Sequence, residues 1–210
     1  MSEIEVNRVS LQMNKVWILK DISFSAKDGM IIGLVGRNGS GKTMLMKCLS
    51  GYIKPDGGNI IIDGRELYKD IEFPPSMGLI LETPSFVPYY SGMKNLQLLA
   101  SLQKKIDKDR IRHCMELAGL QPDSKRPVKK YSLGMRQRLA IAQAIMEEPQ
   151  LLILDEPLNS LDEEGVEDIR SLLLDMKSKG KTIILSSHNK EDIHLLCDIV
   201  IRLKHGEMCS

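Results

Sequence analysis

The segment GRNGSGKT, Gly36–Thr43, constrains the fold of this chain more than any other stretch. It follows the apolar run MIIGLV at 30–35, which has the length and composition of a buried strand. Three glycines in eight residues disfavour the interior of a helix or strand, but they suit a tight loop. A helix is expected to begin near Lys42, so the chain contains a strand–loop–helix unit of the kind that builds α/β folds.

The spacing of this segment also matches G-x-x-x-x-G-K-[ST], a phosphate-binding loop. Glycines allow successive backbone N–H groups to turn toward a phosphate, and the helix adds its positive N-terminal end. Lys42 is expected to reach the β- and γ-phosphates of a nucleoside triphosphate, and the hydroxyl of Thr43 to bind Mg²⁺. An ordinary glycine turn is the alternative, but every fixed position of the motif is filled. The residues expected to contact the nucleotide here are Gly36, Arg37, Asn38, Gly39, Ser40, Gly41, Lys42, Thr43 and Met44.

Composition indicates an ordinary globular protein of one domain, 1–210. Hydrophobic residues make up 42% and the net charge is +1, so no nucleic-acid partner is expected. Apolar runs are too short to span a bilayer, and the N-terminal sequence does not have the form of a signal peptide. Four scattered cysteines without metal-ligand spacing are typical of reduced packing residues, which together favours a cytoplasmic protein. The basic run KRPVKK at 125–130 is interpreted as a solvated loop rather than a binding patch.

Periodicity divides the chain into three parts. Alternation through Ile4–Met13, with a slip near Arg8, predicts strands in the first third. The middle is predicted to be helical and to form an inserted subdomain at about 86–140. The last part alternates helices and strands, which predicts a mostly parallel sheet. Its expected elements are helices at 138–146, 163–179 and 191–197, and strands at 151–154, 182–186 and 199–203.

Two acids end the apolar strand LLILDEP at 151–157. Ligands bind at the carboxyl ends of parallel strands, so Asp155 is suited to hold Mg²⁺ opposite Thr43. Glu156 is suited to polarise an attacking water. A polar strand end near a turn is the alternative for the pair taken alone.

A third motif, YSLGMRQR at 131–138, begins a helix. Ser132 is suited to cap this helix, Gly134 allows a close backbone approach, and a capped helix N-terminus binds anions. An ordinary N-cap would look the same, so the order of the motifs carries the interpretation.

In that order the motifs resemble those of the ATP-binding-cassette (ABC) ATPases across essentially the whole chain. YSLGM resembles the family signature LSGGQ, LLILDEP the Walker B strand and NSLD (159–162) the D-loop, and His188 falls at the switch histidine. The resemblance implies a P-loop NTPase fold with a RecA-like parallel-sheet core, an N-terminal antiparallel β subdomain and an inserted helical signature subdomain. It also implies ATP hydrolysis with Mg²⁺.

The resemblance further implies a head-to-tail dimer, of two identical or two similar cassettes, with two ATP molecules between them. Each site would combine Lys42, Asp155, Glu156 and His188 of one chain with Ser132 and Gly134 of the other. Lys42, Glu156 and His188 are the expected catalytic residues. Loss of the γ-phosphate would remove the bridge and open the dimer.

Three departures from the family pattern matter. Glu82 stands where the family usually has Gln, and it is expected to reach Mg²⁺ or the attacking water. A Glu at this position resembles the bacitracin-resistance and lantibiotic-immunity group of ABC exporters. Leu133 and Met135 replace a glycine and the glutamine of the signature. The adenine-stacking aromatic is replaced by Met13, so Met13 or Trp17, with Ile18 beside it, is expected to contact adenine. Core packing of Trp17 is the alternative.

The predicted partner is a pair of membrane permease subunits, which in the family insert a short helix beside the Gln position. The corresponding surface here runs from Glu82 to Tyr90 and overlaps the aromatic segment PSFVPYYSGM, 84–93. Packing of these aromatics onto the core is an equal alternative. The first function hypothesis is the motor of a bacterial exporter for a peptide antibiotic or other amphipathic compound, peripheral on the inner face of the membrane. The second is an ABC ATPase that remodels a non-membrane complex. The third is a nucleotide-binding regulator with little turnover.

Overall fold

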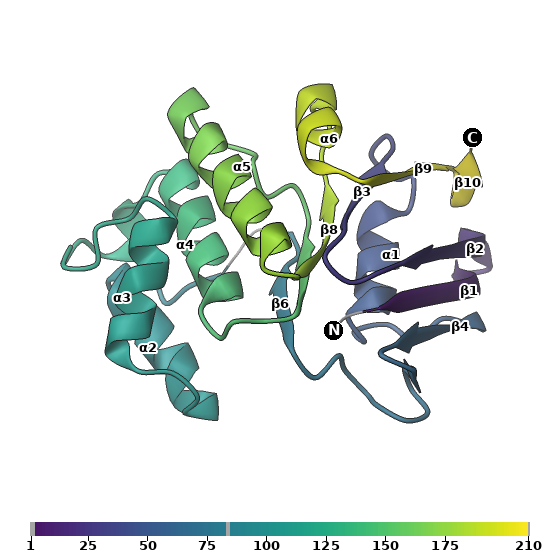
Figure 1. The fold of residues 1–210 in the computed structure, drawn as a ribbon, viewed down its shortest axis with the longest axis horizontal. Coiled ribbons are helices and arrows are strands. Elements are labelled where there is room, and N and C mark those ends of the chain that lie inside the picture. Colours follow the sequence, from purple (N-terminus) through teal and green to yellow (C-terminus); the bar gives the residue numbers. More distant parts are fainter. Residues whose placement is uncertain (1–2, 83–84, 210) are drawn as a thin grey trace.

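The computed structural model describes residues 3–82 and 85–209, which form two β-sheets with helices around them (Figure 1). One sheet is antiparallel in the order β2-β1-β4-β5, and the other has the order β10-β9-β3-β8-β7-β6. The antiparallel strands are β1 Ile4–Met13, β2 Val16–Ala26, β4 Gly57–Ile62 and β5 Arg65–Glu66. The strands of the second sheet are β3 Ile31–Val35, β6 Met77–Ile80, β7 Leu151–Leu154, β8 Thr182–Ser186, β9 Ile199–Lys204 and β10 Glu207–Cys209.

The second sheet is parallel except for β10, as the alternation of helices and strands predicts. β7 and β8 are buried at every position, because their apolar runs have a layer of structure on both faces. Their carboxyl ends meet at one edge of the sheet together with those of β3 and β6. The loops that follow these strands therefore share one edge, where ligands bind in such sheets.

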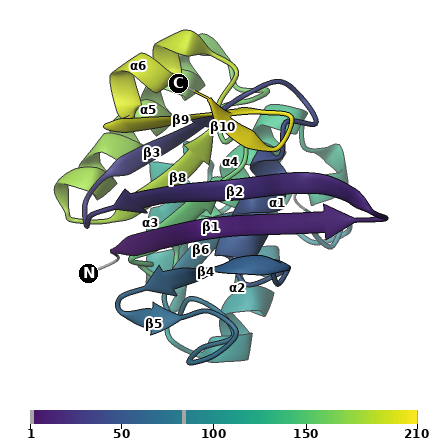
Figure 2. The same cartoon turned by 90° about the vertical axis from the view of Figure 1, so that its right-hand side faces the viewer.

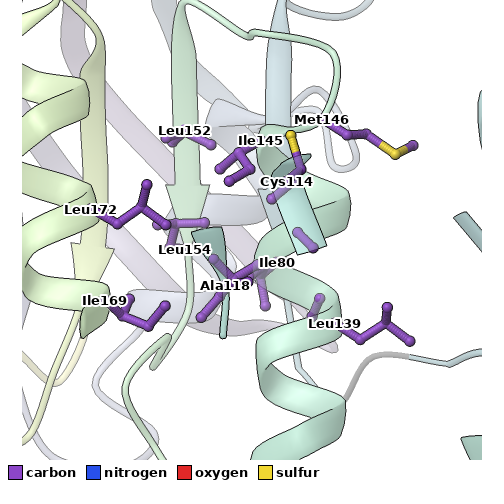
Figure 3. Close-up of a cluster of buried hydrophobic side chains, with 14 of the residues drawn as sticks. Ile80, Cys114, Ala118, Leu139, Ile145, Met146, Leu152, Leu154, Ile169 and Leu172 are labelled. Carbon is purple, nitrogen blue, oxygen red and sulfur yellow. The ribbon is translucent and has the colours of Figure 1, made fainter. Parts of the chain in front are cut away.

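Alternate residues of β7 belong to two separate cores. Leu151 and Ile153 belong to the core that includes α1 (Lys42–Leu49) and the antiparallel sheet. Figure 2 shows that sheet lying across α1. Leu152 and Leu154 belong to the other core, with side chains such as Ile145 and Ile169 from the helices (Figure 3). Those helices are α2 Gly92–Gln103, α3 Lys108–Leu117, α4 Leu133–Ile145, α5 Glu163–Ser178 and α6 Lys190–Leu196.

Several predicted boundaries need correction. α4 begins at Leu133, five residues before the predicted start at 138, because Ser132 caps it by accepting a hydrogen bond from the N–H of Met135 at 3.1 Å. β10 is not predicted from sequence, since it has only three residues, all exposed. The predicted slip near Arg8 is confirmed as a register shift between Val6 and Val9.

The basic run at 125–130 is more ordered than a plain solvated loop. It ends in a short 3₁₀ helix, Val128–Lys130, whose Val128 is buried while both lysines are exposed. The subdomain boundaries at about 86 and 140 stay a prediction. Among the described residues, none of the helices is both long and apolar enough to cross a membrane.

Candidate functional site

The phosphate loop, Gly36–Thr43, joins β3 to α1 and depends on two of its glycines. Gly41 has a φ of 108°, in the left-handed region, and directly precedes α1. A Cβ at Gly36 would lie 2.4 Å from the carbonyl oxygen of Leu203 in β9, so a larger residue would collide with backbone. The other predicted contact residues, Arg37, Asn38, Gly39, Ser40 and Met44, form the rest of the loop and the first turn of α1.

Lys42 is held over this loop by backbone oxygens. Its side chain is buried, and Nζ donates to the carbonyl of Gly36 at 2.7 Å and to that of Arg37 at 3.5 Å. These two carbonyls hold the ammonium group beside the loop. The predicted role of Lys42 requires this position.

Thr43, Asp155 and Ser186 form a chain of hydrogen bonds between three elements. The Thr43 hydroxyl donates to Asp155 Oδ2 at 2.6 Å, and the Ser186 hydroxyl donates to Asp155 Oδ1 at 2.6 Å. The structure thus brings together two of the three residues that sequence assigns to the metal, Thr43 and Asp155. A hydroxyl beside a carboxylate is an all-oxygen donor set, which fits Mg²⁺. Sequence analysis assigns no role to Ser186, although this residue directly precedes Ser187 and His188.

Glu156 lies next to this chain in a constrained position. Its φ is 50°, and its carbonyl accepts a hydrogen bond from the Gln137 amide at 3.3 Å. Its N–H donates to the Ser186 hydroxyl at 2.9 Å. Gln137 also reaches the carbonyl of Pro157 at 3.0 Å, so α4 helps to hold the acidic turn. Sequence analysis did not assign a role to Gln137, although it lies in the signature segment.

The carboxylate of Glu156 is nearly buried, with 19% of its side chain exposed. Burial raises the pKa of Glu156, and the nearby His188 and Lys42 oppose that rise. Its Oε1 lies 3.1 Å from His188 Nε2, yet it accepts no well-formed hydrogen bond from the described residues. A buried acceptor with a raised pKa is suited to take a proton from water.

A buried ion pair supports the loop that carries His188. The Ser187 hydroxyl donates to Asp192 Oδ2 at 2.8 Å. Asp192 Oδ1 accepts from Arg170 Nη2 at 2.6 Å, and both side chains are less than one-tenth exposed. Arg170 comes from α5 and Asp192 from α6, so two helices hold one loop. Sequence analysis missed this pair because its members are 22 residues apart and fit no motif.

The signature residues lie at the start of α4. Ser132 is exposed, and Leu133 is 65% exposed. A Cβ at Gly134 would meet the carbonyl oxygen of Ser160 at 2.6 Å, so the close approach that this glycine allows is to the D-loop segment of its own chain. The trans roles of Ser132 and Gly134 stay a prediction.

Glu82 is not beside the metal candidates in this structure. Its Oε1 accepts a hydrogen bond from Lys47 Nζ at 2.6 Å, and 64% of its side chain is exposed. Glu82 follows β6, the neighbour of β7, so its backbone is near Asp155 while its side chain turns to α1. The prediction that Glu82 contacts Mg²⁺ or water stays a prediction.

Met13 and Trp17 flank the tip of the β1–β2 hairpin, and each is nearly half exposed. Packing of Trp17 in the core therefore does not account for its position. The carbonyl of Ile18 lies 3.1 Å from the place that a Cβ of Gly41 would take, which sets β2 beside the phosphate loop. Their contact with adenine stays a prediction.

The described part of the segment predicted to dock a partner is held by hydrogen bonds and is partly exposed. The buried side chain of Asn95 accepts from the N–H of Val87 at 2.7 Å and donates to its carbonyl at 3.2 Å. Tyr89 is 73% exposed, with Lys129 Nζ 4.4 Å from its ring centroid, whereas Phe86 packs against the helical core. Packing onto the core therefore accounts for Phe86 and not for Tyr89, and docking of a partner at Tyr89 stays a prediction. Pro84, part of the same predicted segment, lies outside the described residues.

A groove of about 530 Å³ lies beside this segment. We refer to it as the α1–β6 groove, since it lies between the end of α1, the end of β6 and α4. Residues around it include Lys47, Tyr52, Leu81, Glu82, Ser85 and Gln143.

Comparison with known sequences agrees with the motif order. A profile of the ABC transporter family matches residues 19–159. The uncharacterized ABC transporter ATP-binding protein YybJ of Bacillus subtilis (strain 168) is 46% identical over 98% of this chain and 94% of its own length. The bacitracin transport ATP-binding protein BcrA of Enterococcus faecalis is 38% identical over 98% of this chain and 67% of its own length. The lantibiotic transport ATP-binding protein SrtF of Streptococcus pyogenes is 33% identical over 98% of this chain and 88% of its own length. The predicted resemblance to bacitracin and lantibiotic exporters is confirmed.

A solved structure confirms the predicted fold. The ATP-binding cassette MJ0796, described as a dimer in a post-hydrolysis state bound to ADP and Pi, superposes with a TM-score of 0.87. The likeness covers 99% of this chain and 97% of that one at 21% identity.

Proposed function

The chain belongs to the ABC transporter family of ATP-binding proteins, and from this premise we propose that it is the motor subunit of a bacterial exporter. The chain is an ATPase that binds ATP. The finer proposal is that two cassettes close around two Mg-ATP and drive separate membrane permease subunits. The proposed cargo is a peptide antibiotic or another amphipathic compound, because the relatives BcrA and SrtF are described as bacitracin and lantibiotic transport proteins.

The observation that carries the motor function is the buried Oε1 of Glu156, which lies beside His188 and accepts no well-formed hydrogen bond from the described residues. Its raised pKa favours proton transfer from a water at neutral pH. The proposed step is hydrolysis of the γ-phosphate by that water, with its proton going to Glu156. His188, 3.1 Å away, would hold Glu156 and the water in line. A regulator with little turnover would have no need of a buried base at this place.

Thr43 and Asp155 are the residues that would hold Mg²⁺. The ion, when bound, would neutralise charge on the β- and γ-phosphates. Lys42 would exchange its bonds to Gly36 and Arg37 for phosphate oxygens, which ties nucleotide binding to the shape of the loop. Ser132 at the start of α4, in the second cassette, would supply the helix N-terminus that faces the γ-phosphate.

The permease subunits would dock at the α1–β6 groove and the exposed Tyr89 beside it. Exposed aromatics with neighbouring cations are common in protein interfaces, and the groove offers both apolar and charged lining. The motor would then be peripheral on the inner face of the membrane through these subunits.

Photocrosslinking from native membranes tests the transporter proposal. A photoreactive residue replaces Tyr89, and mass spectrometry identifies what it joins. The same residue at Leu102, exposed on α2 of the same helical block, is the matched control. We expect a multi-span membrane protein at Tyr89 and not at Leu102. Capture of a non-membrane partner alone, with ATP turnover intact, would favour a remodelling ATPase instead.

A further inference from the structure

Two charged side chains outside the hydrolytic centre lie within one helical turn of it. Thr43 and Lys47 are four residues apart on α1, so they lie on the same face about one turn from each other. Thr43 binds Asp155 directly. Lys47 binds Glu82 with a nitrogen–oxygen distance of 2.6 Å.

The backbone sets Glu82 at the level of the catalytic acids. β6 and β7 are parallel with Ile80 paired to Leu154, and the N–H of Asp155 donates to the carbonyl of Ile80 at 2.7 Å. Glu82 therefore follows its strand by the same two residues as Glu156 follows the neighbouring strand. Both have a φ in the left-handed region, 57° and 50°.

We infer that Lys47 is a positioning residue, which holds the carboxylate of Glu82 about one turn of α1 away from Thr43 and Asp155. Without the ammonium group of Lys47, the carboxylate of Glu82 would turn to the strongest other positive charge at this edge of the sheet. That charge would be the divalent ion that Thr43 and Asp155 are proposed to hold. The ion pair with Lys47 competes with that position, so Lys47 sets how much Glu82 contributes to metal binding.

This inference deepens the proposed function and rests on it in one respect. Lys47 and Glu82 both line the α1–β6 groove, where a permease segment is proposed to dock. A segment in the groove would contact the ion pair, so its arrival would alter the balance between the two positions of Glu82. Lys47 thereby links the docking site to the metal site through one side-chain exchange.

A double-mutant cycle tests the positioning role without a permease. The variants are Lys47→Met, Glu82→Gln and the double variant, with Lys47→Arg as the conservative control. Calorimetry measures the affinity for Mn²⁺, a probe for Mg²⁺, of each protein saturated with a non-hydrolysable ATP analogue. Thermal unfolding of each variant checks that the fold is kept.

We expect Lys47→Met to tighten Mn²⁺ binding about two- to fivefold, the range that a partly exposed ion pair supports. The gain should vanish in the double variant, and Lys47→Arg should keep the affinity of the unmodified chain. The inference would be overturned if Lys47→Met changed the Mn²⁺ affinity equally in the unmodified chain and in the Glu82→Gln variant. It would also be overturned if Lys47→Met did not change that affinity at all. Because no membrane protein is present, failure of this cycle and failure of the Tyr89 capture are independent results.

Discussion

Glu156 and Glu82 occupy equivalent backbone positions and have opposite surroundings. Each follows a neighbouring parallel strand by two residues, with a left-handed φ. The Glu156 side chain is 19% exposed and has its pKa raised by burial, whereas that of Glu82 is 64% exposed and paired with Lys47. The strand ends thus place both acids at the same edge of the sheet, and the packing around each acid decides its burial and its partner.

The largest expected effect comes from exchanging each acid for its amide. Glu156→Gln should lower the rate of ATP hydrolysis about 10²- to 10⁴-fold, because it removes the general base. Glu82→Gln should change that rate by less than about tenfold, since its side chain is held at Lys47. Steady-state phosphate release measures both. Equal losses in the two variants would erase the contrast between the two positions.

The surroundings of Glu156 depend on a buried pair that Glu82 lacks. Arg170→Leu leaves Asp192 buried without its partner and should lower the free energy of unfolding by about 3–5 kcal/mol. Lys179→Leu, at the residue directly after the same helix, breaks an exposed pair with Asp175 and should cost at most about 1 kcal/mol. Urea unfolding measures both. A loss for Arg170→Leu as small as that of the control would mean that the pair does not support the loop of His188.

The pH dependence of turnover should separate the two acids further. Glu156 must be ionised to accept a proton, and its raised pKa means that it protonates at a higher pH than an ordinary glutamate. As pH falls, kcat should therefore begin to decline at a pH higher than the ordinary glutamate pKa of about 4.3. Glu82→Gln should leave this acid limb in place. If the acid limb disappeared in Glu82→Gln, the titrating base would be Glu82 and not Glu156.

The smallest expected effect concerns the proposed contact with a second cassette. Leu133→Gly removes an exposed side chain beside Ser132, so the two cassettes should approach more closely. We expect the ATP-dependent dimer to tighten by less than about tenfold. The gain is limited because glycine at the start of α4 costs up to about 1 kcal/mol of helix stability. Analytical ultracentrifugation measures the dimer affinity, with Leu102→Gly as the control. A weakened dimer would mean that Leu133 itself contributes to the contact.

Sequence alone predicts the parts of this site that are continuous in the chain. The phosphate loop and the strand ending in Asp155 and Glu156 are read directly, because buried strands and glycine spacing leave local signals. The fold class follows from the order of these elements.

The remaining parts depend on residues that only the fold brings together. Separate elements are joined by the ion pair of Arg170 with Asp192, the ion pair of Lys47 with Glu82 and the close approach of Gly134 to Ser160. A short exposed strand such as β10 leaves no periodicity to detect. Side-chain direction after a strand, which separates Glu82 from Glu156, is likewise set by tertiary packing.

The most direct test of the motor account is the molar mass of the Glu156→Gln variant in solution. Light scattering after size exclusion would compare saturating Mg-ATP with Mg-ADP. The account predicts twice the mass of one chain with Mg-ATP and a single chain with Mg-ADP, because only the intact γ-phosphate joins the two cassettes. A single chain at saturating Mg-ATP, with nucleotide bound, would contradict it.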